Sequence, residues 1–304
     1  MTANVARGAL PPRHALLALA IVAVWGTNFV VIKLALGHLP PLLFATLRFT
    51  FAAIPGVFIV RRPAVPLMQL ALYGILIGVG QFGLLFIAIA GGIAPGLASL
   101  VVQSQVFFTI GLAVWLSGEQ VRLGQLVALA LGAGGIGVIA AHTGGATSIT
   151  GIALVLGAAM AWGCGNMVQR RSVGVDMLAY VVWASLFAVP PLFVLSLVRE
   201  GWPAMVGGVR DAGWVTWAAI GWQAVGNTMF GYGAWGFLLT RYPAVAVAPW
   251  SLLVPVFGMS AAAAWLGEPL PGWKLAAGAL ILGGLGLSLL GPTLARRWAN
   301  GQEA

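Results

Sequence analysis

The sequence predicts an all-α membrane protein of ten transmembrane helices, arranged as two inverted five-helix repeats. The first observation is composition: 61% of the 304 residues are hydrophobic and 7% are charged, whereas a soluble chain carries about 25% charged residues. The second is that the apolar residues fall into runs of the length, about 20 residues, that a membrane helix needs. The third is an internal repeat, expected to span residues 14–141 and 149–291.

Short links rich in proline and glycine separate the predicted spans. The runs do not alternate polar with apolar residues, which argues against a transmembrane barrel. The first run is expected to be retained rather than cleaved as a signal, because its apolar stretch is too long. The link at about 199–212 is expected to lie along the membrane interface. The predicted spans cover residues 14–36, 41–60, 67–89, 95–116, 121–141, 149–170, 177–198, 213–239, 244–266 and 271–291.

The positions of the basic residues predict the orientation of the chain, since cytoplasmic links are enriched in lysine and arginine. With the N-terminus inside, ten arginines fall on inside segments and four basic residues on outside segments, while Arg48 lies within the second span. Both termini are therefore expected to be cytoplasmic.

Two sequence matches define the internal repeat. Trp25–Asn28 recurs as Trp162–Asn166, with an offset of 137 between the tryptophans, and residues 93–139 align without a gap on 242–288, which places Glu119 on Glu268. Because each repeat has an odd number of spans, the two repeats must enter the membrane from opposite sides. Inverted repeats are typical of alternating-access transporters with a site near the midplane. The alternative is a duplication retained only for packing.

The same motifs resemble those of a known family. The Trp-Gly start of the first and sixth spans, Leu47–Phe49 in the second span and the Gly-Glu ends of the fourth and ninth spans are similar to the EamA domain of the drug/metabolite transporter superfamily. Two tandem EamA domains cover nearly the whole chain, which is most similar to amino-acid exporters of the YddG type. The resemblance implies a basket of ten helices, with spans three, four, eight and nine around a central cavity and spans five and ten at the periphery.

Several classes of function are excluded by what the sequence lacks. A single cysteine excludes a disulfide scaffold or a cysteine-built metal site, and no phosphate-binding Gly-Lys-Ser/Thr loop is present. The basic residues are scattered, so nucleic acid is not an expected partner. All six acids lie at span ends, in links or in the tail, which weakens a proton-coupled mechanism without excluding it. We expect no enzymatic activity, no metal and no cofactor.

Charged residues and prolines within or near the spans are candidates for gating or structural roles. Arg48 is the most deeply placed charge, about eight residues into the second span, and such a residue is a functional candidate by default. It could bind a substrate carboxylate, hydrogen-bond carbonyls at a broken helix or snorkel outward. The resemblance favours a structural role, because members with unrelated substrates share it. Lys33 and Arg170 are interpreted as anchors or gate partners, and Pro95 and Pro249 are expected to help spans four and nine move.

Uncharged polar and aromatic side chains within the spans are the better candidates for substrate binding, because they would be unpaired if they faced lipid. For each amide the alternative is a hydrogen bond between helices, worth about 1 kcal/mol. On an ideal α-helix Gln103 and Gln105 point about 160° apart, so at most one is expected to face the cavity fully. The predicted substrate-binding residues are Gln81, Gln103, Trp162 and Ser251, followed by Gln105, Asn166, Asn227, Tyr232 and Trp235.

The predicted function is that of a secondary transporter in the bacterial inner membrane that exports neutral or aromatic amino acids, or related metabolites, by alternating access. Aromatic walls with amides and a hydroxyl, and no fixed acid, suit small zwitterions or moderately apolar solutes. One alternative is an exporter of drugs or nucleobase-like metabolites in the same family. Others are a channel, which would need a continuous polar stripe or charge ring, and a membrane protein that does not transport. The expected partners are a small-molecule substrate and the lipid bilayer. A monomer is expected, although glycine pairs such as Gly74 and Gly78 permit a dimer.

Overall fold

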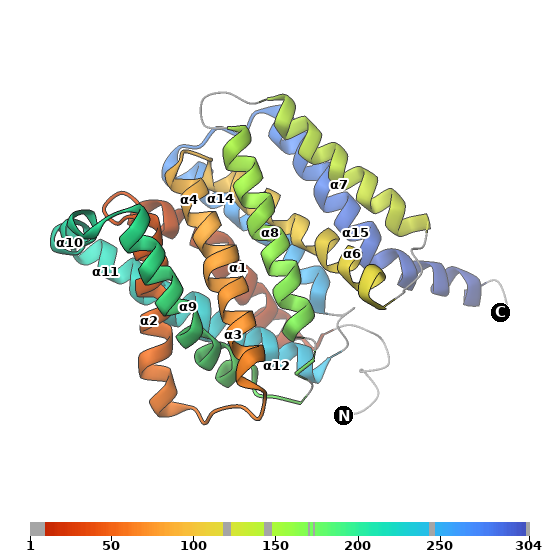
Figure 1. Cartoon of the computed structure of the whole chain (residues 1–304). Helices are drawn as coiled ribbons and strands as arrows, with labels where there is room; N and C mark the ends of the chain where they lie inside the picture. The colour runs from red at the N-terminus through yellow and green to blue at the C-terminus, as the bar shows by residue number, and fades with distance from the viewer. Residues whose placement is uncertain are drawn as a thin grey trace.

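The computed structural model describes residues 10–117, 123–142, 148–169, 171–172, 174–242 and 247–301, and within these ranges every regular element is a helix. Figure 1 shows these helices gathered into one bundle. Glu119, which the internal repeat aligns with Glu268, and Arg170, a predicted anchor, lie outside the described residues.

Prolines begin several helices in the first half of the chain. Pro12, Pro41 and Pro95 each occupy the first turn of a helix, where the missing N–H is not needed and the fixed φ angle suits the helix. The elements are α1 (Pro12–Ala35), α2 (Pro41–Ile59), the continuous rod of α3 (Leu67–Ile75), η2 (Leu76–Gly83) and α4 (Leu84–Ala90), then α5 (Pro95–Val101), η3 (Val102–Ser104), α6 (Gln105–Ser117) and α7 (Leu123–Ala141).

The second half of the chain shows the ordinary signals of helix ends. The Asp176 carboxylate accepts a hydrogen bond from Leu178 N at 2.9 Å and caps the next helix, and Gly267, with φ 65°, ends another in the left-handed conformation. The elements are α8 (Ile149–Gln169), α9 (Met177–Arg199), α10 (Trp202–Asp211), α11 (Trp214–Gly221), η4 (Trp222–Tyr232), α12 (Gly233–Arg241), η5 (Ala248–Leu253), α14 (Val254–Leu266) and α15 (Gly272–Gly301). The 199–212 link thus contains the helix α10, and α15 continues ten residues beyond the predicted end at 291.

Five helices in the described ranges are long and apolar enough to cross a membrane. They are Pro12–Ala35, Pro41–Ile59, Leu67–Ala90, Ile149–Gln169 and Met177–Arg199, and shorter apolar helices cover Ala130–Ala141 and Trp250–Leu266. Large apolar side chains also face outward, among them Phe58, Trp115 and Trp214. Because such side chains are favourable against lipid and unfavourable in water, the outer surface fits a membrane-embedded bundle.

Close helix contacts depend on small residues. A Cβ atom at Gly26 on α1 would lie 2.6 Å from the Val254 carbonyl oxygen on α14. The close approach predicted at Gly74 and Gly78 is made within the chain, where the two glycines face Ala184 and Ala188 of α9. In Figure 1, α7 and α15 lie side by side at one edge of the bundle, in agreement with the expected periphery.

Four elements in the described part of the chain depart from α-helical geometry, and they occur at matching places in the two halves. The third and eighth predicted spans contain the π-helical segments η2 and η4, and the fourth and ninth contain the 3₁₀ segments η3 and η5. Such segments interrupt the ordinary backbone bonding pattern and are frequent at functional sites. Here all four contribute residues to one cavity.

Candidate functional site

A central cavity with an empty volume of about 580 Å³ lies between the two halves of the chain. Its wall combines aromatic rings, apolar side chains and uncharged polar groups, and none of the described residues that line it is acidic or basic. The first half contributes Trp25, Asn28, Phe29, Ile32, Gln81, Phe82, Leu85, Val102, Gln103 and Gln105, and the second contributes Trp162, Asn227, Tyr232, Ser251 and Val254.

Seven of the nine predicted substrate-binding residues line this cavity. The polar members come from four different segments, η2, η3 with the start of α6, η4 and η5, so the cavity wall is assembled from residues far apart in sequence. The seven are Gln81, Gln103, Gln105, Trp162, Asn227, Tyr232 and Ser251.

The sequence predicts that at most one of Gln103 and Gln105 faces the cavity fully, and the structure places both in the cavity wall. Residues 102–104 form a 3₁₀ turn, whose advance of about 120° per residue brings the two side chains closer to one face than the 100° of an α-helix would. Gln103 Nε2 donates to the Ser251 carbonyl at 3.3 Å. This bond joins η3 of the first half to η5 of the second.

Asn166 and Trp235 do not line the cavity but support residues that do. Asn166 Nδ2 donates to Gln105 Oε1 at 2.9 Å, which orients that glutamine. The Trp235 ring lies 5.2 Å from the ring of Trp25. Both predicted residues therefore lie one layer behind the wall.

The predicted substrate-binding residues include none from α1. Trp25 and Asn28 line the cavity, and each is tied to η4: Trp25 Nε1 donates to the Asn227 carbonyl at 3.4 Å, and Asn28 Nδ2 donates to Gln223 Oε1 at 3.3 Å. The repeated Trp-Gly motif was the available signal, since its second copy supplied Trp162.

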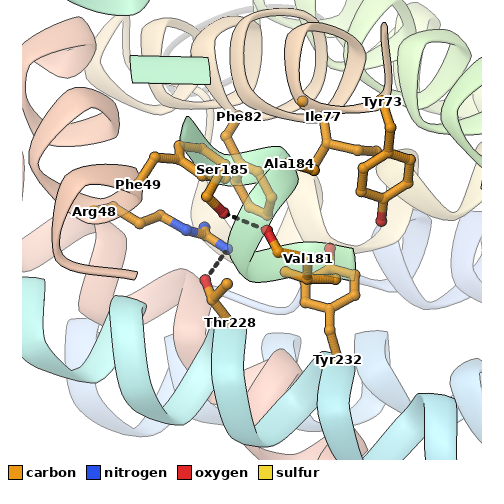
Figure 2. A pocket seen from close by; sticks show the side chains of 11 residues that line it. Arg48, Phe49, Tyr73, Ile77, Phe82, Val181, Ala184, Ser185, Thr228 and Tyr232 are labelled. Carbon is orange, nitrogen blue, oxygen red and sulfur yellow. Dashed lines mark hydrogen bonds between the residues drawn. The ribbon is translucent and has the colours of Figure 1, made fainter. Parts of the chain in front are cut away.

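Arg48 is completely buried, so it does not snorkel outward. Its Nη2 donates to Asn227 Oδ1 at 2.9 Å and to Thr228 Oγ1 at 3.1 Å, and its guanidinium carbon lies 3.5 Å from the centre of the Phe82 ring. Figure 2 shows the guanidinium directed into a second cavity, between Phe82 above and Thr228 below. This Arg48 pocket shares Phe82 and Tyr232 with the central cavity.

The remaining gating candidates lie near helix ends. Lys33 Nζ donates to the Ile89 carbonyl at 3.5 Å, near the end of α4. Pro95 begins α5, whose next residue, Gly96, donates its N–H to Glu268 Oε2 at 3.0 Å. Pro249 lies within η5. Sequence reasoning missed Glu268 as a contact to α5, although its place in the repeat was visible.

Within the described ranges, no group of three or more histidine, cysteine, aspartate and glutamate side chains is placed to hold a metal ion. The described cavities offer hydrogen bonding by amides, contact with aromatic faces and, at Arg48, a buried positive charge.

Comparison with known proteins identifies relatives along most of the chain. A probable amino-acid metabolite efflux pump of Salmonella typhimurium is 43% identical over 281 residues, 90% of this chain and 94% of that protein. A probable amino-acid metabolite efflux pump of Escherichia coli K12 is 41% identical, covering 92% and 95%. A probable terminal-alkyne amino-acid exporter of Streptantibioticus cattleyicolor is 28% identical, covering 87% and 89%.

A solved crystal structure with 20% sequence identity has the same fold, with a TM-score of 0.64 over 94% of this chain and 97% of the other. The EamA-like transporter family matches two segments, residues 13–141 and 149–290. With its apolar helices and bacterial efflux-pump relatives, the protein is a multi-pass protein of the bacterial inner membrane. The chain belongs to the EamA-like transporter family.

Proposed function

We propose that the protein exports neutral or aromatic amino acids, or related metabolites, as a secondary transporter that works by alternating access. The observation that carries the proposal is the central cavity, whose wall is drawn from both family segments. The relatives named as amino-acid metabolite efflux pumps support this choice of substrate class.

The proposed architecture has ten transmembrane helices, with one five-helix repeat at 14–141, an inverted one at 149–291 and both termini in the cytoplasm. The equivalent positions of η2 and η4, and of η3 and η5, support two related halves. Inverted halves around one site provide two exchangeable arrangements, open to opposite sides. In this scheme the contacts of Lys33 with α4 and of Glu268 with α5 close the cavity on one side of the membrane. The segments that move are α5, which begins at Pro95, and η5, which contains Pro249.

The cavity wall suits an amino acid whose side chain is apolar. Trp25, Trp162 and Tyr232 offer aromatic faces, while Gln81 and Gln103 offer amide donors and acceptors. Apolar walls with a few fixed polar groups are the usual form of a small-molecule site. We expect the protein to have no enzymatic activity, no cofactor and no nucleic-acid partner.

The experiment is counterflow in liposomes that contain the purified protein, with labelled threonine, methionine and tryptophan, each with and without a pH gradient. Saturable counterflow with competition among amino acids is the expected result and excludes a channel. Insensitivity to the gradient would favour facilitated exchange. Folded protein that gives no counterflow with any of the three would overturn the amino-acid assignment in favour of a drug or nucleobase-like substrate.

The position of the site is tested by thiol labelling. The single cysteine, Cys164, permits a Cys164→Ser background into which Gln81→Cys, Gln103→Cys and Ser251→Cys are introduced singly. We expect aqueous thiol reagents to reach these positions, and substrate to slow the reaction. Met160→Cys, on the outer face of α8 and 51% exposed, is the lipid-facing control and should not react. Inaccessibility of all three cavity positions from both sides would exclude the cavity as a transport site.

A further inference from the structure

We infer that Arg48 binds the carboxylate of the exported compound, and that the carboxylate is required for recognition whereas the amino group is not. The inference rests on the proposed function and names the chemical class that the site selects, apolar monocarboxylates. It assigns Arg48 a binding role in place of the structural role favoured by sequence resemblance.

The guanidinium of Arg48 is incompletely satisfied. Nη2 makes both of its hydrogen bonds, while Nε and Nη1 are buried and have no hydrogen-bond partner. A buried charged donor without an acceptor is unfavourable. Nε–H lies on the edge of the planar guanidinium that it shares with Nη2, whereas Nη1 lies on the side of Cδ. The edge of Nε and Nη2 binds the two oxygens of a carboxylate with matching geometry once a substrate oxygen replaces an acceptor of Nη2.

The contacts of Arg48 leave its charge uncompensated. An amide oxygen, a hydroxyl and the Phe82 ring surround it. The acids of the described residues are engaged elsewhere or lie at the surface: Asp176 and Glu200 cap α9 and α2, Glu268 pairs with Lys274, and Asp211 is exposed at the end of α10. The pocket is therefore positively charged and complementary to an anion.

The Arg48 pocket is separated from the central cavity by side chains of the two π-helical segments. Phe82 of η2 and Tyr232 of η4 line both spaces, and Asn227 of η4 lines the central cavity while accepting the Arg48 bond. A carboxylate that enters from the central cavity replaces the Asn227 amide at Nη2, on a segment whose backbone bonding is already irregular.

The amino group of a substrate would meet weaker partners. Among the residues that the structure describes, none in the wall of the central cavity is acidic, and the available acceptors are neutral, such as Gln81 Oε1, which is buried and unpaired. The carboxylate is thus recognised by the full charge of Arg48, whereas the amine meets only neutral dipoles. Loss of the carboxylate should therefore cost much more affinity than loss of the amine.

The first test uses the wild-type protein and three related indoles. Tryptophan, indole-3-propionate, which lacks the amine, and tryptamine, which lacks the carboxylate, compete against labelled tryptophan in counterflow. We expect indole-3-propionate to compete nearly as well as tryptophan, and tryptamine at least about tenfold more weakly, because a site built around one polar group rejects analogues that lack it. Equal competition by tryptamine would overturn the inference and leave the proposed function intact.

Substitutions at Arg48 test whether this side chain produces the preference for the acid over the amine. Arg48→Gln should abolish the preference for the acid over the amine, and Arg48→Lys should retain part of it. Arg61→Gln, at an exposed arginine at the end of α2, is the matched control and should keep the wild-type preference. If Arg48→Gln folds and keeps the preference, the carboxylate is bound elsewhere and the inference fails. If it does not fold, the competition in the wild-type protein still decides.

A binding measurement separates this inference from the proposed function. A ligand of the folded state raises the temperature of unfolding, so purified protein is heated with indole-3-propionate or with tryptamine. If counterflow is absent for every amino acid, the export proposal fails, yet stabilisation by the acid alone, reduced in Arg48→Lys and lost in Arg48→Gln, would still support the carboxylate site. Stabilisation by neither compound, or equally by both, would overturn it.

Discussion

Glu268 and Lys274 form a salt bridge of 2.7 Å in which the two side chains are 8% and 6% exposed. The same carboxylate accepts the Gly96 N–H at 3.0 Å, so it also caps α5, which belongs to the other family segment. A negative charge at a helix N-terminus is favourable because unpaired backbone N–H groups and the helix dipole point toward it. The pair thus joins the two segments at one end of the bundle.

Removal of this carboxylate should destabilise the fold. Glu268→Gln leaves Lys274 buried without a counter-charge, and breaking a buried pair from one side costs about 3 kcal/mol or more. Thermal unfolding of the purified variant measures the loss. Asp211→Asn removes an exposed acid and should leave the unfolding temperature unchanged; equal behaviour of the two variants would show that the buried pair does not stabilise the protein.

Gly74 should not tolerate even alanine. A Cβ atom there would collide with the Ala184 carbonyl of α9 and lie 3.3 Å from Phe187 Cβ, and overpacking costs about 1–3 kcal/mol. Gly221→Ala is the control, because nothing lies near the added methyl group. We expect reduced thermal stability for Gly74→Ala alone, and a native-like Gly74→Ala would mean that α3 and α9 separate at little cost.

Trp162 should contribute to the affinity for substrate. Trp162→Ala removes one aromatic face of the central cavity, and the loss of about 1.4 kcal/mol of binding corresponds to tenfold in affinity. The expected result is a rise of about tenfold in the half-saturating concentration for tryptophan counterflow. Trp214→Ala, at a side chain that is 81% exposed, serves as the comparison, and an identical effect of both substitutions would contradict a specific role.

A carboxylate introduced into the protein at position 227 should occupy the binding site at Arg48 in place of the substrate. Asn227→Asp places an acid at the side-chain position whose Oδ1 lies 2.9 Å from Arg48 Nη2, and a close opposite charge is a strong competitor for the substrate carboxylate. Counterflow should fall at least about tenfold. Asn227→Ala removes the amide without supplying a charge and should be less severe. If the two variants lose equal activity, the amide and not the charge balance is responsible.

The sequence predicted the local features of the fold well. The starts of α2 and α5 match the expected span starts at residues 41 and 95, because prolines and apolar run length are local signals. The helical irregularities could not be predicted in this way. η3 changes the direction of Gln103 relative to Gln105, and η2 carries Gln81, although neither segment has a composition that distinguishes it from an α-helix.

The sequence by itself determined the class of the protein, the positions of its apolar segments, its family and most of the residues around the central cavity. These follow from composition, run length and repetition, each of which is read along the chain. The tertiary structure decided which side chains meet. Arg48 and Asn227 are 179 positions apart, a separation that no local sequence pattern spans. Their pairing depends on how α2 packs beside η4. The unpaired Nε and Nη1 of Arg48, the wall that its pocket shares with the central cavity and the cap that Glu268 places on α5 all arise from such packing.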